Sequence, residues 1–285
     1  MRNLTVAVMG LGLIGGSIAK KLAFEGVKVI GYDINKNAEQ NALKEGAVAE
    51  LLSPKEAVAK ADITLLSMYP DAALDFIKEN KDYFKKGAVL TDVLGIKTPI
   101  AELCDSIDGS FVYVGGHPMA GKEVSGYDNA SEYLFQGANY IIIPSDKATE
   151  NQIELIEDMA RLLGAGTITR TTAQQHDEII AYTSQLPHVI AVAMCDTPLL
   201  IKHTHFTGGS FEDVTRVAKV NAELWTQLFM ENREKLLEIT EGFEKSIARM
   251  KDALKTENKD ALKEIFIKVK KDKELVEYEN HKSKS

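Results

Sequence analysis

Short apolar runs alternate with helical patterns through the first 170 residues of the chain. The apolar runs are rich in β-branched residues and lie at 4–9, 27–32, 62–68, 88–93, 111–114, 140–143 and 166–170. Between several of them apolar residues recur with the period of a helix, at 18–23, 71–84, 100–107 and 151–163. Because strands that alternate with helices build βαβ units, this half predicts an α/β fold with a Rossmann-type doubly wound, mostly parallel sheet.

The pattern changes after residue 170, where the strand patterns fade. Three helical patterns follow, at 172–200, 221–251 and 259–279. We therefore predict an α/β domain over residues 1–170 and an all-helical domain over residues 171–285. Long apolar helix stripes are buried either within one bundle or against a second copy of the chain, and we expect a homodimer formed through the helical domain.

Composition narrows the classes of protein that this chain can represent. It has 285 residues, of which 45% are hydrophobic, so it is expected to fold around a core. The net charge is −8 and no long basic block is present, which argues against a nucleic-acid partner. Cys104 and Cys195 are far apart, as expected for a reducing cytoplasm. No run approaches the roughly 18 apolar residues that indicate a membrane span.

A glycine-rich turn joins the first strand to the first helix. Its spacing is Gly-x-Gly-x-x-Gly, with Gly10 expected to form the tight turn, Gly12 to let a pyrophosphate approach, and Gly15 to let the helix pack on the strand. The N-terminus of the helix supplies free N–H groups for phosphate oxygens. The candidate cofactor-binding residues are Gly10, Leu11, Gly12, Leu13, Ile14 and Gly15, together with Ser67 near the end of the 62–68 strand.

An acidic residue, Asp33, follows the second strand. A carboxylate at this place accepts hydrogen bonds from both hydroxyls of an adenosine ribose and repels a 2′-phosphate, which favours NAD over NADP. Lys36 lies close by and is a cation that weakens this preference. The alternative for the whole segment is a glycine-rich turn that holds no ligand.

A second candidate for chemistry is His117, in the segment 115–121 that follows an apolar strand. Pro118 disfavours the α-region for the residue before it, so His117 is expected to be extended at the exit of the strand. Ligands bind at that exit in open α/β sheets, and an imidazole there can take a proton near neutral pH. The alternative is a capped turn with a hydrogen-bonded histidine.

The helical half offers further polar residues that can face a cleft. Pro187 is expected to kink its helix beside His188, while His176 lies near the start of the same pattern. Arg216 is either an ion-pair partner or a clamp for a carboxylate, and Trp225 is either a core residue or part of a site. The pair His203 and His205 has no further ligand at suitable spacing, so we expect no metal site.

These motifs together resemble the prephenate/arogenate dehydrogenase family of tyrosine biosynthesis, over nearly the whole chain. In the α/β half the resemblance rests on Gly-Leu-Gly-Leu-Ile-Gly-Gly-Ser at 10–17, Asp-Val-Leu-Gly-Ile-Lys at 92–97 and Gly-His-Pro-Met-Ala-Gly at 116–121. In the helical half it rests on His-Asp at 176–177, Ser-Gln-Leu-Pro-His at 184–188, Asp-Val-Thr-Arg at 213–216 and Trp225.

The resemblance implies an NAD-dependent oxidative decarboxylation of prephenate to 4-hydroxyphenylpyruvate. It implies that His117 is the catalytic histidine, which binds the ring hydroxyl and accepts its proton. Arg216 matches an arginine that holds a substrate carboxylate, and His188 matches a histidine of the nicotinamide–substrate pocket. His176 and Trp225 match positions close to the substrate.

One position departs from the family pattern. Many members have Asp-Val-Gly-Ser-x-Lys, in which the serine hydroxyl supports the catalytic histidine and substrate, and here Gly95 takes the place of that serine. The alternatives that stay open are arogenate as substrate, a β-hydroxyacid-type dehydrogenase, and an NAD-binding protein without turnover. Because no regulatory domain is expected after the helical half, any inhibition by tyrosine would act at the active site.

Overall fold

The computed structural model describes residues 1, 3–122, 124–202 and 204–282. The chain divides into two compact units, Met1–Arg233 and Glu234–Ser285. The first unit contains the sheet, its covering helices and a run of further helices, and the second contains a helical hairpin.

The described part of the first unit contains one eight-stranded sheet with the order β3-β2-β1-β4-β5-β6-β7-β8. Its strands are β1 Thr5–Met9, β2 Lys28–Tyr32, β3 Glu50–Leu51, β4 Ile63–Leu66, β5 Ala88–Asp92, β6 Phe111–Pro118, β7 Asn139–Pro144 and β8 Thr167–Arg170. All neighbouring pairs are parallel except β6 with β7. The prediction of a doubly wound, mostly parallel sheet is confirmed, and the strand order reverses between β1 and β4, where such sheets bind ligands.

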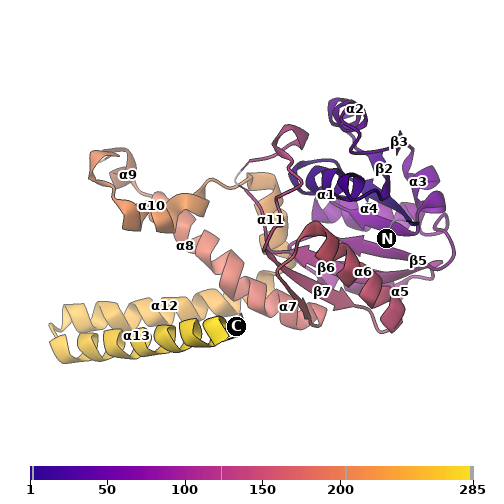
Figure 1. The fold of residues 1–285 in the computed structure, drawn as a ribbon. Coiled ribbons are helices and arrows are strands. Elements are labelled where there is room, and N and C mark those ends of the chain that lie inside the picture. The colour runs from indigo at the N-terminus through magenta and orange to yellow at the C-terminus, as the bar shows by residue number, and fades with distance from the viewer. Residues whose placement is uncertain (2, 123, 203, 283–285) are drawn as a thin grey trace. The chain divides into compact units, whose positions relative to one another are not determined.

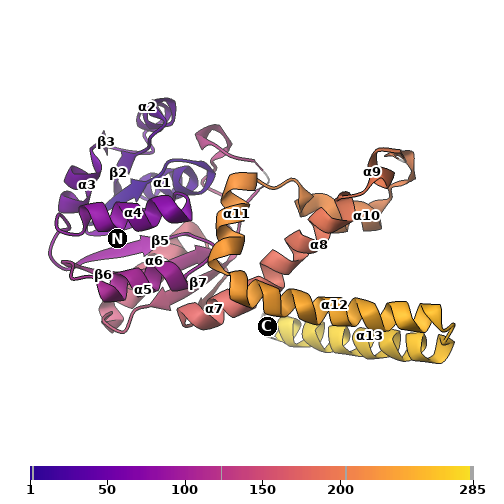
Figure 2. The same cartoon turned by 180° about the vertical axis from the view of Figure 1, so that it is seen from behind.

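Helices cover both faces of this sheet (Figures 1 and 2). They are α1 Leu13–Phe24, α2 Lys36–Lys44, α3 Pro54–Lys60, α4 Pro70–Asn80, α5 Thr98–Ser106 and α6 Glu150–Leu163. One apolar core contains side chains of α1, α2 and α6, and a second contains those of α3, α4 and α5. Because strands β1 and β4 send alternate side chains into the two cores, they are apolar on both faces, as their continuous apolar runs predicted.

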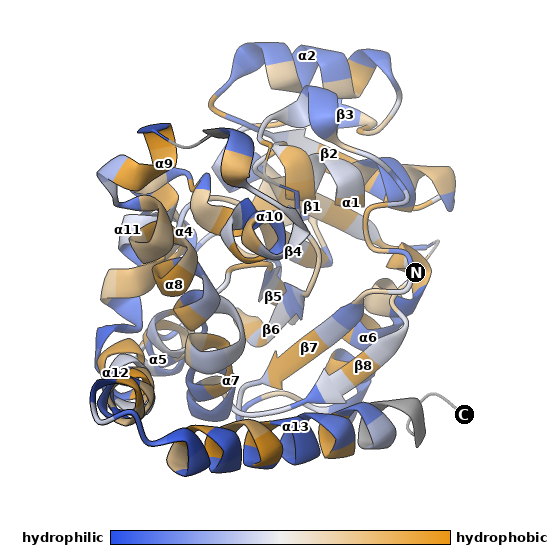
Figure 3. Cartoon of the chain, turned by 90° about the vertical axis from the view of Figure 1, so that its left-hand side faces the viewer, coloured by the Kyte–Doolittle hydropathy of each residue, from blue (hydrophilic) through white to orange (hydrophobic). Residues whose placement is uncertain are grey.

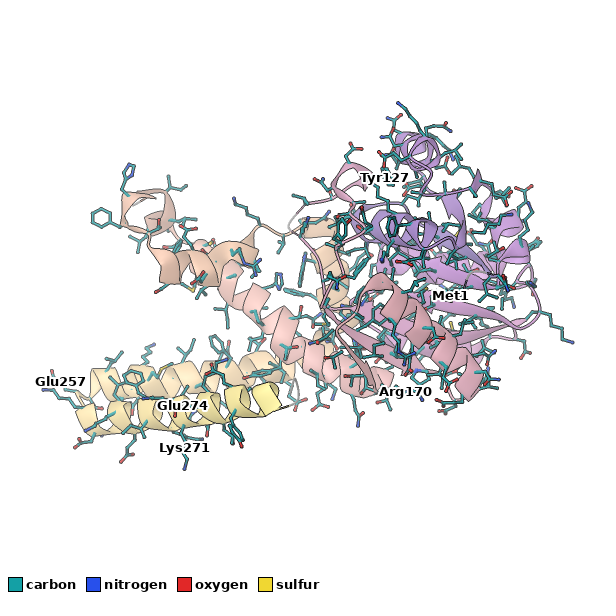
Figure 4. The ribbon with its side chains drawn as sticks, viewed as in Figure 1. Met1, Tyr127, Arg170, Glu257, Lys271 and Glu274 are labelled. Atoms are coloured by element: carbon teal, nitrogen blue, oxygen red, sulfur yellow. The ribbon has the colours of Figure 1, made fainter. Side chains whose placement is uncertain are left out.

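The segment between β6 and β7 folds back onto α1. It includes the 3₁₀ turn η1 (Tyr127–Asn129), and Figure 4 labels Tyr127 above that helix. A Cβ added at Gly16 would lie 2.8 Å from the Tyr127 ring, and the Ser131 N–H donates to the Ser17 hydroxyl at 2.9 Å. The small residues after the glycine turn therefore let this segment pack closely against the helix.

A series of short helices follows the sheet in the first unit. They are α7 Ala173–Ile180, the π-helical segment η2 Ala181–Gln185, α8 Leu186–Cys195, α9 Pro198–Lys202, the 3₁₀ turn η3 Thr204–Phe206, α10 Gly209–Thr215, the 3₁₀ turn η4 Arg216–Ala218 and α11 Ala222–Glu231. Pro187 has no N–H to donate to the preceding turn, and the helix is widened into a π-helix in that turn, over Ala181–Gln185. The expected interruption at Pro187 is thus present, one turn earlier than the proline itself.

The prediction of one continuous helix over 221–251 is wrong. The helix ends after Glu231, at Asn232, whose side chain is buried and donates to the Asp177 carbonyl and to Gln185 Oε1, both at 2.9 Å. Gln185 Nε2 in turn donates to the Leu228 carbonyl at 2.9 Å. These partners come from other helices, so the sequence pattern gave no sign of the break.

The second unit is formed by α12 Arg233–Lys255, which begins one residue before it, and α13 Lys259–Lys282. The two helices lie side by side in both views of the chain (Figures 1 and 2). Hydrophilic and hydrophobic residues alternate along α13 in Figure 3, and several of its apolar side chains are exposed, including Phe266, Ile267 and Leu275. Among the described helices, none has the length and apolar character that crossing a membrane requires.

We predict that Gly15→Ala lowers the free energy of unfolding by about 3 kcal/mol or more, because its Cβ would lie only 1.9 Å from the Gly10 carbonyl oxygen. Chemical denaturation measures this. Gly12→Ala is the matched control, since a Cβ there has no neighbour within 4 Å, and its stability should stay within about 1 kcal/mol of the parent. Equal stability of the two variants would contradict the assigned packing.

Candidate active site

The glycine turn is placed as the spacing predicted, at the carboxyl end of β1. Gly10 has a φ of +99°, and a Cβ on it would lie 2.1 Å from the carbonyl oxygen of Ser67 at the end of β4. Gly12 is the N-cap residue of α1 and has open space where its Cβ would be. Open space in front of a helix N-terminus fits the pyrophosphate of a dinucleotide, so these residues are suited to hold one.

The Asp33 carboxylate lies beside this turn. It accepts hydrogen bonds from the Leu11 N–H at 2.6 Å and from the Asn35 N–H at 2.7 Å. The Lys36 ammonium is bonded to Glu39 at 2.8 Å, so this cation is engaged by a carboxylate of its own helix. The arrangement supports the predicted preference for NAD, because the Lys36 cation is paired with Glu39.

His117 is the last residue but one of strand β6, so it lies at the exit of the strand as expected, but the strand runs to Pro118 and not only to Val114. Strand β5 pairs only with the segment 111–113, and beyond it β6 continues by antiparallel pairing with β7, where His117 lies opposite Ile141. The extended conformation expected before Pro118 is present. Because β6 runs past the end of β5, His117 still lies beyond the carboxyl end of its parallel neighbour.

A hydrogen-bonded chain connects His117 to the start of α5. His117 Nδ1 lies 2.8 Å from His176 Nε2, and His176 Nδ1 lies 2.7 Å from Asp177 Oδ1. The Asp177 carboxylate also accepts from the Lys97 N–H at 2.9 Å and from the Thr98 N–H at 2.8 Å. Asp177 therefore fills the hydrogen-bonding role of a cap for α5 although it belongs to α7.

A buried ion pair lies beneath this chain. The Lys97 side chain is 0% exposed, and its ammonium contacts the Asp92 carboxylate and donates to the Gly116 carbonyl at 2.5 Å. The other Asp92 oxygen accepts from the Tyr113 hydroxyl at 2.8 Å. Sequence reasoning used Lys97 only as part of a motif and missed this network, although a lysine five residues after Asp92 in an apolar stretch was a usable signal.

The electrostatic surroundings favour neutral imidazoles. Burial lowers the pKa of His117 well below its ordinary value, and the positive charge of Lys97 lowers it further. Burial also lowers the pKa of His176, against the opposing effect of Asp177. Burial alone would raise the pKa of Asp177, but hydrogen bonds from His176 and Thr98 outweigh it and hold that pKa below its usual range.

His188 and Trp225 come together in space from α8 and α11. Their rings stack with centroids 3.6 Å apart, and His188 Nδ1 donates to the Ser184 carbonyl at 2.8 Å. Gly95 lies nearby in the fold, since a Cβ on it would be 3.4 Å from the Leu228 side chain of α11. Helix α11 thus faces both the β5–α5 connection and α8.

The remaining candidate residues are Arg216 and the pair His203 and His205. Arg216 is exposed and begins η4, which packs against α8, the helix of His188. His203 lies outside the described residues. In the part of the chain that the structure describes, no group of three or more His, Cys, Asp and Glu residues is arranged to hold a metal ion.

A doubly wound sheet with this glycine turn, an acidic residue after β2 and a half-buried imidazole beyond the strand ends is typical of a nucleotide-dependent dehydrogenase. Two family models match the chain: "Prephenate dehydrogenase, nucleotide-binding domain" over residues 18–169 and "Prephenate dehydrogenase, dimerization domain" over residues 172–268. The chain belongs to the prephenate dehydrogenase family, as the resemblance predicted, and is an NAD-dependent oxidoreductase of that family.

Individual relatives agree with this assignment. The prephenate dehydrogenase of Lactococcus lactis is 30% identical, with the match covering 95% of this chain and 77% of that protein. The solved prephenate dehydrogenase of A. aeolicus, in complex with hydroxyphenyl propionate and NAD+, is 30% identical with a TM-score of 0.85, covering 96% of this chain and 98% of that one. The solved Synechocystis arogenate dehydrogenase is 25% identical with a TM-score of 0.82, covering 96% of this chain and 100% of that one.

We predict that Gly12→Ala weakens NAD binding by about tenfold or more, because the added methyl occupies the open space in front of α1. Titration calorimetry with NAD+ measures the change. Gly242→Ala in α12 is the matched control, since its Cβ also meets nothing within 4 Å, and it should bind NAD like the parent. Unchanged affinity in Gly12→Ala would contradict the location of the pyrophosphate.

We also predict that the free energy of unfolding decreases as the pH falls below about 6.5, the ordinary histidine pKa of the unfolded chain. The folded protein holds the pKa of His117 and His176 lower, so only the unfolded state takes up these protons. Each histidine contributes a slope of up to about 1.4 kcal/mol per pH unit. Thermal melts between pH 5 and 8 should give a shallower slope for His117→Asn than for the parent protein.

Proposed function

We propose that this protein catalyses the NAD-dependent oxidative decarboxylation of prephenate to 4-hydroxyphenylpyruvate, with His117 as the proton acceptor. The observation that carries the proposal is the half-buried His117 imidazole, held through Nδ1 beyond the carboxyl end of β5. Relatives that match this chain over most of their length are named prephenate dehydrogenases. NAD+ supplies the acceptor for the hydride that leaves the ring carbon bearing the hydroxyl.

The residues of this chain then account for the proton. Because Nδ1 of His117 is occupied by His176, Nε2 is the ring nitrogen that accepts the proton of the substrate hydroxyl. Breaking the bond between the ring and its carboxylate releases CO2 and leaves its electron pair in the ring, which becomes aromatic. His117 returns the proton to the phenolate oxygen, so the histidine ends as it began.

The other candidates have supporting roles in this proposal. Arg216 binds a substrate carboxylate, because a guanidinium offers two parallel N–H donors to two oxygens. His188, fixed by its stacking on Trp225, lines the side of the pocket near the nicotinamide. Gly95 lies at the substrate with no hydroxyl to offer, so a water or another side chain makes the contact that a serine would make.

A second substrate, arogenate, is supported by the Synechocystis arogenate dehydrogenase, which covers the same length of chain. The chemistry at the ring is identical for the two substrates, which differ only in a keto or an amino group on the side chain. Residues that meet that group decide the preference.

We further propose a homodimer, formed through a helical domain that begins at residue 171, in the reducing cytoplasm. The matched dimerization model spans 172–268. Large exposed apolar side chains in that range are Leu199, Ile201, Met230, Leu237, Leu254 and Phe266. Both cysteines are free. Light scattering of the purified protein measures the assembly.

We predict that the purified protein forms NADH with prephenate and NAD+, and that His117→Asn lowers kcat by about 10²- to 10⁴-fold because it removes the base. NAD binding should be retained in the variant, since His117 belongs to β6 and the glycine turn lies at β1. Stopped-flow absorbance of NADH measures turnover, and arogenate and NADP+ are run in parallel. A variant with unchanged turnover would contradict the role of His117.

A further inference from the structure

We propose that His176 and Asp177 are positioning residues that fix the tautomer of His117, with its proton on Nδ1 and its lone pair on Nε2. This inference rests on the proposed function for its catalytic consequence. In this proposal His176 contacts His117 and not the substrate, whereas the resemblance implied a position close to the substrate.

His176 is buried and has no free ring nitrogen. It is 1% exposed, and its ring nitrogens are hydrogen-bonded to His117 on one side and Asp177 on the other. A ring that is enclosed and bonded at both nitrogens has no atom left for a substrate. Its place in the molecule is therefore that of a link between two other side chains.

Asp177 is the last side chain in this series of hydrogen bonds, and its partners determine which atom donates in each of them. Backbone N–H groups can only donate, and those of Lys97 and Thr98 both point at the Asp177 carboxylate. A carboxylate that accepts from both sides is stable in its ionised form, so His176 Nδ1 carries a proton and donates to it.

The same reasoning continues to His117. A neutral His176 with its proton on Nδ1 has only a lone pair on Nε2. His117 Nδ1, at 2.8 Å from that nitrogen, must then be the donor. His117 Nε2 is left as the acceptor, which is the state a general base needs. The backbone at the start of α5 thus determines the reactive nitrogen of His117 through three successive hydrogen bonds.

The other ionisable groups around this chain leave that direction unchanged. Lys97 and Asp92 neutralise each other beneath it, and Tyr113 donates to Asp92. Tyr140 of β7 is fully buried against Gly116. The pKa of Glu231 in α11 is raised to about 7 by burial and by the negative charges of Asp71 and Asp177, and no hydrogen bond joins its carboxyl to the His117–His176–Asp177 series among the described contacts.

The test uses ¹⁵N-histidine NMR of the full-length protein with NAD+ bound, together with kinetics. In the parent protein we expect His117 to be protonated on Nδ1 and unprotonated on Nε2 at pH 7.5. His176→Phe keeps the volume and removes the acceptor, so His117 should lose this single tautomer. kcat should fall by about 10²-fold or more, with KM and NAD affinity within about threefold of the parent. His176→Gln, which can accept and donate at similar positions, should recover at least about tenfold of the loss.

Tyr140→Phe is the matched control, because it removes a buried hydroxyl from the strand beside His117 but leaves the hydrogen bonds between His117, His176 and Asp177 intact. Its kcat, pH profile and His117 signals should equal those of the parent. The inference is overturned if the parent carries the His117 proton on Nε2, or if His176→Phe keeps both the tautomer and kcat. Should His176→Phe not fold, the parent spectrum and His176→Gln decide in the same way. Absence of turnover in the parent would refute the proposed function alone, since the tautomer is read without substrate.

Discussion

The Asp177 carboxylate accepts two hydrogen bonds from the backbone at the start of α5 and one from the His176 ring. A buried carboxylate without such donors would be costly, so its position and the path of the chain at residues 97 and 98 stabilise each other. His176 is held by this carboxylate and in turn holds His117. The position of the His117 imidazole therefore depends on an acidic side chain that is two hydrogen bonds away from it.

The same region buries a second set of charges, the pair Lys97 and Asp92. Burying an ion pair is seldom a net source of stability, because both charges lose their hydration. Here the lysine also donates to the carbonyl of Gly116, the residue before His117, and so fixes the backbone of β6 next to this histidine. Its charge helps to keep His117 neutral. The pair contributes more to the arrangement and the electrostatics of the site than to folding.

The helical segment that completes the first unit is arranged by polar contacts as well as by apolar stripes. Asn232 ends α11 and joins it to Gln185 and to the backbone of Asp177. The π-helical segment before Pro187 lies between His176, which is hydrogen-bonded to His117, and His188, which stacks on Trp225.

The sequence by itself determined the alternating strands and helices, the glycine turn and the family. These depend on local spacing, because Gly10, Gly12 and Gly15 act through the backbone of one turn and apolar runs report burial directly. Only the tertiary structure decided that β6 continues through His117, that the helix predicted over 221–251 ends at Asn232, and that His176 stands behind His117. Each of these is set by a partner far along the chain, 59 residues away for His117 and His176, and the residue pattern around a position carries no record of a contact made at that separation.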